Sequence, residues 1–367
     1  MPVDAYTDPP PPQVATAGDA GPDWWIYRCS PEPHDGIRRL PEAPPWRSYS
    51  DGEERGDLLD PPDPTAGAGE HSRRSRNLRA SFYQAEDKEV HLVNMALMLR
   101  RPLLVTGPPG VGKSTLPYSI ARELRLGPVL RWSVTSRTTL QDGQYEYDAV
   151  GRLQDTGLRE RRSDIPQSPG DPAPSEIGHY LRLGPLGTAL LPWRVPRVLL
   201  IDEIDKGDAD FPNDLLHVFE EGEFTIRELA RLRRPTSTVM TADDEGWVEL
   251  TRGRVRCHEF PLVVMTSNGE REFPQAFLRR CIRLEIQRPD RNKLARLLAA
   301  HLPASGAPAK AVCEELITEF LRKQDDDGAE LANDQLLNAA LLAGRLWDDP
   351  KEHALIVDHL LRPLNEG

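Results

Sequence analysis

The sequence predicts an α/β fold, in which helices cover both faces of a parallel sheet, followed by a small all-helical domain. Two largely apolar runs, residues 197–201 and 261–265, have the composition of central parallel strands, which are buried on both faces. A third run, 102–106, is followed directly by a glycine-rich turn and a helical pattern. After Pro289 only helical patterns remain. We therefore expect an α/β domain over residues 79–288 and a helical domain over 289–367.

The first 78 residues differ from the rest in composition. Residues 1–78 are rich in proline and acidic side chains, which predicts a largely extended arm. Two interpretations of its aromatic patch stay open: it packs on the chain's own core, or it docks a neighbouring subunit or a partner protein. Because no phosphate-binding or acid–base residue stands out, we expect assembly or docking rather than catalysis. The patch consists of Trp24, Trp25, Tyr27 and Trp46.

The remaining elements follow from hydrophobic spacing. A helical pattern runs from Asp87 to Arg100, a second helix follows the glycine-rich turn as far as about Leu124, and residues 129–132 form another strand. Residues 154–175 have the composition of a mobile insertion. In the last domain the spacing predicts three helices and a short tail helix. The three helices are expected at 290–302, 309–323 and 333–347.

Composition excludes several classes of protein. There are 46 basic and 58 acidic residues, and a net charge of −12 argues against bulk attraction to nucleic acid or to an anionic membrane surface. The four cysteines lie far apart and form no C-x-x-C pair, so neither a zinc site nor a disulfide framework is expected. No apolar stretch approaches the ~18 residues that span a bilayer. These features predict a cytoplasmic protein that does not act on membranes.

A nucleotide-binding motif occupies the glycine-rich turn. It fits the pattern G-x-x-x-x-G-K-[ST], with a strand before it and a helix after it. Backbone N–H groups of such a loop converge on phosphate oxygens, and the helix N-terminus adds a favourable dipole. Lys113 is expected to reach the β- and γ-phosphates of ATP, and the Ser114 hydroxyl to ligate Mg²⁺. The motif comprises Gly107, Pro108, Pro109, Gly110, Val111, Gly112, Lys113, Ser114 and Thr115.

Polar residues follow the ends of two later apolar strands. The strand at 197–201 leads into Asp202 and Glu203, and the next one leads into Thr266-Ser267-Asn268. Because the carboxyl ends of parallel strands meet at one edge of a sheet, these side chains are expected beside the phosphate crevice. A carboxylate pair at the end of a buried strand is costly unless it is used. We assign Asp202 to the Mg²⁺ shell and Glu203 to polarising the attacking water.

Together with Phe273-Pro274-Gln275-Ala276-Phe277-Leu278-Arg279-Arg280-Cys281, these motifs resemble those of the AAA+ ATPases, in particular the MoxR-like branch. The resemblance covers residues 80–345 and implies that Asn268 is the sensor 1 residue. It also implies that Arg280 occupies the position of the arginine finger, which acts on the γ-phosphate held by the neighbouring subunit. Arg279 replaces an aspartate of the family motif, so which of the two arginines acts stays open. The sensor 2 position, within 331–336, has no basic residue.

The resemblance implies an ATPase whose turnover remodels or regulates a partner protein, working as a homo-oligomer, a hexameric ring. The partner classes that it implies are a von Willebrand A-domain protein or a protease effector of a bacterial defence system. A nucleic-acid motor and an ATP-gated assembly switch with little turnover are the alternatives. A predicted strand at 252–256 would place Arg252, Arg254 and Arg256 on one face. That face is either a surface that grips an acidic polypeptide or nucleic acid, or a solvated strand face.

Overall fold

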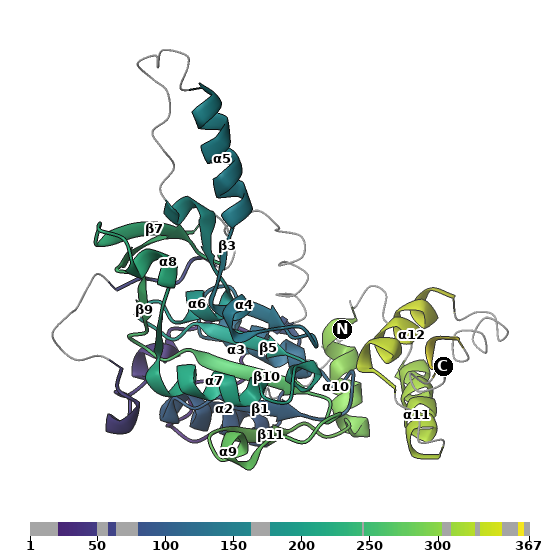
Figure 1. The fold of residues 1–367 in the computed structure, drawn as a ribbon. Coiled ribbons are helices and arrows are strands. Elements are labelled where there is room, and N and C mark those ends of the chain that lie inside the picture. The colour runs from purple at the N-terminus through teal and green to yellow at the C-terminus, as the bar shows by residue number, and fades with distance from the viewer. Residues whose placement is uncertain are drawn as a thin grey trace, which may run out of the picture.

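The computed structural model describes residues 21–49, 58–63, 80–162, 177–243, 246–302, 310–326, 331–346 and 359–362. Its centre is a five-stranded parallel sheet with the strand order β11-β1-β10-β5-β2 (Figure 1). All six residues of β10 are buried, as expected for a strand covered on both faces. The predicted α/β fold is confirmed. The strands are β1 (Leu103–Thr106), β2 (Leu130–Ser133), β5 (Val198–Asp202), β10 (Leu262–Ser267) and β11 (Ile282–Glu285).

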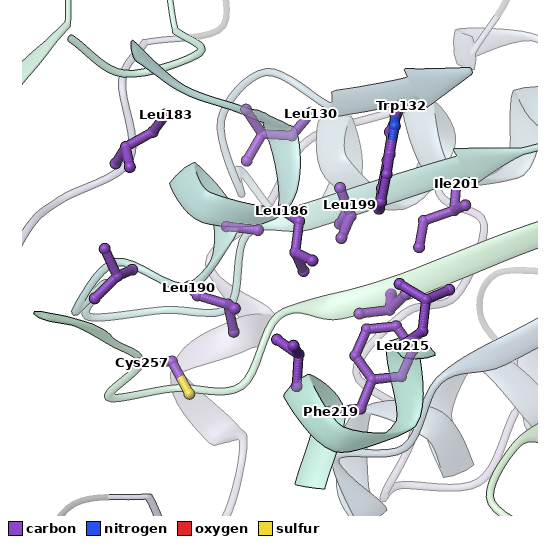
Figure 2. Close-up of a cluster of buried hydrophobic side chains, with 14 of the residues drawn as sticks. Leu130, Trp132, Leu183, Leu186, Leu190, Leu199, Ile201, Leu215, Phe219 and Cys257 are labelled. Atoms are coloured by element: carbon purple, nitrogen blue, oxygen red, sulfur yellow. The ribbon is translucent and has the colours of Figure 1, made fainter. Parts of the chain in front are cut away.

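Neighbouring residues of a strand point to opposite faces of the sheet, and helices cover both faces of this one. On one face Leu103 and Val105 pack in a cluster with residues of α2 and α3. On the other face Leu199 and Ile201 pack with residues of α6 and α7 (Figure 2). The helices of the two layers and the short ones between them are α2 (Asp87–Leu99), η4 (Lys113–Thr115), α3 (Leu116–Glu123), α4 (Leu140–Gln144), α6 (Pro185–Ala189), η6 (Ile204–Lys206), α7 (Phe211–Glu221) and α9 (Gln275–Leu278).

A smaller sheet, with the order β3-β4-β7-β8, lies apart from the main one, and β6 pairs antiparallel with β9. From this region α5 projects away from the body of the molecule (Figure 1). These elements are β3 (Tyr145–Tyr147), α5 (Ala149–Arg162), η5 (Ile177–Tyr180), β4 (Leu181–Leu183), β6 (Glu223–Thr225), α8 (Arg227–Ala230), β7 (Thr236–Met240), β8 (Trp247–Thr251) and β9 (Arg254–Arg256).

The structure adds detail to one expectation for this region and corrects another. The first part of the insertion expected at 154–175 is helical as far as Arg162, within α5, which Asp148 caps by accepting a hydrogen bond from the Gly151 N–H over 2.7 Å. Its remainder, 163–176, lies outside the described residues. The strand expected at 252–256 begins only at Arg254, since Arg252 has a φ of 50° and lies in the turn before it.

The two arginines that do lie on β9 share one acidic partner. Arg254 and Arg256 are 2.8 Å and 3.5 Å from a carboxylate oxygen of Glu223 on β6. Glu223 carries one negative charge, so it offsets only one of these two positive charges. The expected row of three arginines on one strand face is wrong, because Arg252 lies in the turn before β9.

The C-terminal helices pack around an apolar cluster of their own, which includes Leu294, Phe320 and Leu336. Asp290 begins the first of them by accepting a hydrogen bond from the Lys293 N–H over 2.7 Å. Among the described residues, no helix has both the length and the apolar character needed to cross a membrane. The helices are α10 (Arg291–His301), α11 (Lys310–Asp326) and α12 (Asn333–Leu346), close to the predicted bounds.

The described part of the N-terminal arm packs on the α/β domain. Trp25, Ile26 and Tyr27 are buried in the same cluster as α2 and α3. The side chain of Asn94 accepts the N–H groups of Ile26 and Tyr27, at 2.7 and 2.9 Å, and donates to the Tyr27 carbonyl. Of the two interpretations of the aromatic patch, packing on the chain's own core is therefore the one that applies to Trp25 and Tyr27. Trp46, on η3 (Pro45–Arg47), is 78 % exposed, and a second short helix, η2 (Gly36–Arg39), precedes it.

Candidate active site

The glycine-rich loop connects β1 to α3 at the carboxyl edge of the main sheet. Gly107 has a φ of 147°, and a Cβ there would collide with the carbonyl oxygen of Ile286. Gly110 has a φ of 75°, and a Cβ there would collide with Ala332 of the helical domain. Both positions therefore require glycine. The loop can therefore approach its neighbours closely.

The amine of Lys113 links this loop to the neighbouring strand. Its Nζ donates hydrogen bonds of 2.7 Å to the carbonyl oxygens of Gly107 and Pro108 and to Oδ1 of Asn268. Burial lowers the pKa of Lys113, although Asp205, Asp202 and Glu203 raise it in part. The structure thus brings together Lys113 and Asn268, two of the residues predicted from separate motifs.

Asp202, at the end of β5, joins the loop through Ser114. Its Oδ1 accepts hydrogen bonds of 2.7 Å from the hydroxyls of Ser114 and Thr266, and its Oδ2 lies 2.7 Å from a guanidinium nitrogen of Arg131. Burial raises the pKa of Asp202, but the hydrogen bonds from Ser114, Thr266 and Arg131 outweigh that effect and lower it. A hydroxyl next to an ionised carboxylate is an oxygen donor set that suits Mg²⁺. Ser114 and Asp202 therefore fit the predicted metal role.

Glu203 lies in a constrained conformation directly after Asp202. Its φ of 60° and ψ of 49° are left-handed, which is costly for a residue with a side chain, and its N–H donates to Oγ1 of Thr266 over 2.9 Å. The carboxylate is 45 % exposed and lies 2.8 Å from Nζ of Lys206. It faces a polar groove of about 530 Å³ that Thr135, Asp205 and Glu270 also line. Glu203 is thus accessible from outside the loop.

Asp205 was not predicted from the sequence, yet it organises the end of β10. Its Oδ2 accepts hydrogen bonds from the hydroxyl of Ser267, at 2.9 Å, and from the N–H groups of Asn268 and Glu270, at 2.9 and 3.2 Å. The side chain is 3 % exposed. A buried carboxylate with three donors fixes the direction in which Asn268 points. The sequence signal that could have identified Asp205 was its position three residues after Asp202.

The arginine pair directly follows α9 and lies apart from the group formed by Lys113, Asp202 and Asn268. Arg280 forms an ion pair with Glu220 of α7, and its Nη1 donates to the Ala276 carbonyl over 3.1 Å. Arg279 is exposed, and its guanidinium makes no ion pair with the part of the chain that is described. Neither arginine contacts Lys113 or Asp202, so within one chain the predicted site residues form two groups.

The helical domain closes on the glycine-rich loop through its backbone. Asn333, at the start of α12, donates its N–H to the Gly110 carbonyl over 3.2 Å. Lys293 of α10 forms ion pairs with Glu89 and Glu86, at 2.8 and 3.2 Å. The segment expected to carry sensor 2 thus reaches the loop, and it does so without a basic side chain.

Comparison with known families identifies the central part of the chain. Residues 102–281 match the model of an AAA domain of the dynein-related subfamily. That range contains the glycine-rich loop, Asp202, Glu203 and Asn268, and it ends directly after the arginine pair. No curated protein matches the chain. An AAA domain implies nucleotide hydrolysis in general, and such proteins commonly form oligomeric rings.

Proposed function

We propose that this chain, with its AAA domain at residues 102–281, is an ATPase of the MoxR-like branch that uses turnover to remodel or regulate a partner protein. The observation that carries the ATPase assignment is the hydrogen-bonded set at one edge of the sheet, in which Lys113 reaches Asn268 and Ser114 reaches Asp202. These contacts join three separate chain segments. A purely structural loop would have no need of an ionised carboxylate and an amine at this place.

Each residue has a role that its position supports. Lys113 neutralises the β- and γ-phosphate charge, and Ser114 and Asp202 hold Mg²⁺, which supplies further neutralisation of the phosphates when it is bound. Glu203 accepts the proton of the attacking water, and its exposure to the groove leaves it accessible to that water. Asn268 orients the water or the γ-phosphate through its amide.

The separation of the arginine pair from this set supports a ring. Arg279 and Arg280 directly follow α9, where they cannot complete the site of their own chain, and Arg279 is exposed. In a homo-oligomeric ring, which we propose to be hexameric, the pair would complete the site of the next subunit. The site is thus shared between two copies.

The partner is proposed to be a protein. The exposed apolar side chains Val150 and Leu153 lie on α5, which projects from the body (Figure 1). Exposed Trp247, on β8, lies against His179 of η5, with their ring centroids 5.5 Å apart. Projecting apolar side chains are typical of contact surfaces for other proteins. By its resemblance to the MoxR-like branch, the partner is proposed to be a von Willebrand A-domain protein or a protease effector of a defence system.

One alternative keeps a specific observation in its favour. At the sensor 2 position the chain reaches the loop with Ala332 and the Asn333 N–H instead of a basic side chain. This arrangement favours an ATP-gated assembly switch with little turnover. The intact pair of Asp202 and Glu203 favours sustained hydrolysis, which we retain as the proposal.

Two substitutions test the ATPase assignment. Lys113→Ala is expected to abolish nucleotide binding, measured with a fluorescent ATP analogue, because the phosphate charge loses its counter-charge. Glu203→Gln is expected to bind ATP normally and to hydrolyse it at least ~10²-fold more slowly, the scale for losing a positioned base. Glu270→Gln, in the same groove but exposed, is the matched control. Wild-type turnover in Glu203→Gln would refute the mechanism.

A further inference from the structure

The helix that directly precedes the arginine pair is too short to be stable by itself. α9 has four residues, Gln275–Leu278, and a single turn of helix is unstable in isolation. The chain continues the turn through Arg279, whose N–H donates to the Gln275 carbonyl over 3.1 Å. The carbonyl groups at the end of a helix have no partner within it. The carbonyls of the arginine pair therefore take their partners from outside α9, either from solvent or from another part of the chain.

Arg101 supplies both hydrogen bonds. Its Nε donates to the Arg280 carbonyl over 3.1 Å, and its Nη2 donates to the Arg279 carbonyl. A guanidinium is planar, so two bonds to consecutive carbonyls fix the orientation of the backbone as well as its distance. The next residue, Pro102, accepts the N–H of Ile282 over 2.8 Å, and from there β1 and β11 pair in register.

The position of Arg101 separates it from the nucleotide site of its own chain. It precedes β1, whereas the glycine-rich loop begins at Gly107 after the far end of that strand. Six residues of extended chain span about 20 Å, at ~3.3 Å per residue. Arg101 therefore cannot touch phosphates held by its own Lys113.

We infer that Arg101 is a positioning residue for the arginine pair and that it acts on hydrolysis in the neighbouring subunit. The inference rests on the proposed function, in which Arg279 and Arg280 complete the next subunit's site. Arg101 holds the backbone of both arginines, so it sets where either guanidinium can reach. Its loss would leave the charge of the pair intact and misplace it, and a small misplacement of a catalytic group lowers turnover by up to about 10².

Turnover and nucleotide affinity separate this role from a general structural one. In assembled Arg101→Ala, we expect turnover to fall at least about tenfold, while affinity for a fluorescent ATP analogue stays within about twofold. Arg101→Lys keeps the charge and one donor group, and is expected to recover part of the loss. Arg283→Ala removes an exposed arginine from β11 nearby and is the matched control. A parallel loss of affinity in Arg101→Ala would overturn the inference.

Mixed rings test the direction of the effect. Arg101→Ala subunits retain Glu203, and inactive Glu203→Gln subunits retain Arg101. Suppose that Arg101 acts on the neighbour. A Glu203→Gln subunit then presents a correctly positioned arginine pair to an adjacent Arg101→Ala subunit, which has an intact Glu203. That interface is complete, and activity returns in part. If Arg101 supports only its own site, no interface is complete and activity does not rise above that expected from the residual activity of the Arg101→Ala subunits. Should Arg101→Ala fail to assemble, Arg101→Lys takes its place in the mixture.

A second mixture distinguishes this inference from the proposed function. Arg280→Ala mixed with Glu203→Gln tests the shared site without involving Arg101. Recovery there but not with the Arg101 variants would overturn the inference and leave the shared site standing. Recovery in neither mixture would overturn both, because the arginine pair would then have no action on the neighbour.

Discussion

The carboxylate of Asp205 holds the backbone of Asn268, whose N–H donates to Oδ2 of Asp205 over 2.9 Å. The same oxygen accepts the Ser267 hydroxyl, so one buried side chain fixes the end of β10. The side chain of Asn268 in turn accepts from Lys113. The residue predicted to be sensor 1 is therefore positioned by a residue of the segment that follows β5.

This relationship predicts the effect of removing Asp205. Asp205→Ala leaves two N–H groups and a hydroxyl without their acceptor and frees Asn268 to move. Because misplacement of a catalytic group is costly, turnover is expected to fall by about 10- to 100-fold with ATP affinity little changed. Asp205→Asn retains an acceptor oxygen and should lose less. Steady-state hydrolysis and analogue binding measure both quantities, and wild-type turnover in Asp205→Ala would contradict the role.

The sequence predicted the parts of the site that are local in the chain. The glycine-rich loop and the two strands ending at Asp202 and Asn268 are contiguous patterns, and the structure places them together. Asp205 and Arg131 were missed because their partners lie 62 and 71 positions away. Arg131 alternates with buried residues on β2 and looks like any exposed strand residue until β5 lies beside it.

The N-terminal arm was harder still to predict. Its proline content is typical of extended chain, which is correct for local conformation, since Ile26 and Tyr27 lie in no helix or strand. What fixes Tyr27 is tertiary: Asn94, 67 positions away, and the hydroxyl of Ser119, 92 positions away at 3.0 Å. Composition and periodicity carry no record of such contacts. The same reason hid the two bonds that Arg101 makes.

The arginine pair gives a second prediction. Arg280 is bound to Glu220 in its own chain, whereas Arg279 is exposed. A partly exposed ion pair contributes only ~0.2–1 kcal/mol, while an arginine finger accelerates hydrolysis by about 10³-fold or more. The ion pair with Glu220 is therefore too weak to keep Arg280 from a phosphate in the neighbouring subunit. We expect Arg280 to be the finger because of its position in the sequence motif.

Arg280→Ala is accordingly expected to lose about 10³-fold in turnover and Arg279→Ala clearly less. Glu220→Gln, which frees Arg280, should change turnover by less than about fivefold. Hydrolysis by assembled protein at saturating ATP measures all three variants. The opposite ranking of the two arginine variants would assign the finger to Arg279.

The arm gives a third prediction, on stability. Trp25 is buried against α2, so Trp25→Ala is expected to lower the free energy of unfolding by about 3–5 kcal/mol. Tyr27→Phe removes the bond to Ser119 and should cost about 1 kcal/mol. Trp46→Ala, at an exposed site, should stay within about 0.5 kcal/mol. Denaturant unfolding monitored by circular dichroism measures these differences.

Deleting residues 1–78 is expected to do more than remove a docking arm. Because the deletion removes Trp25 and Tyr27 from the core, the truncated protein is expected to unfold more easily and to lose ATP binding with the fold. Docking remains a proposal for Trp46. Weaker assembly or partner capture in Trp46→Ala, with unchanged stability, would support it, and unchanged assembly and capture would count against it.

The last prediction concerns pH and the buried carboxyl of Glu123, at the end of α3. It accepts hydrogen bonds from the N–H groups of Arg28 and Ser30, at 2.6 and 2.7 Å, and lies 3.0 Å from Nε2 of His34. Burial raises the pKa of Glu123 from 4.5 to about 7, and the backbone hydrogen bonds lower it only in part. Burial also lowers the pKa of His34.

The sign follows from the direction of the shift. With its pKa raised on folding, Glu123 binds its proton more tightly in the folded state, so its contribution is fully present below pH 4.5 and is lost as the pH rises through about 7. We therefore expect the free energy of unfolding of the wild type, minus that of Glu123→Gln, to fall by about 3 kcal/mol between pH 5 and pH 8. His34 acts in the opposite direction and contacts Glu123, so both proteins are compared in a His34→Gln background, which removes its titration. Denaturant unfolding at the two pH values measures the difference, and an unchanged difference would show that Glu123 is ionised throughout and that its backbone donors outweigh burial.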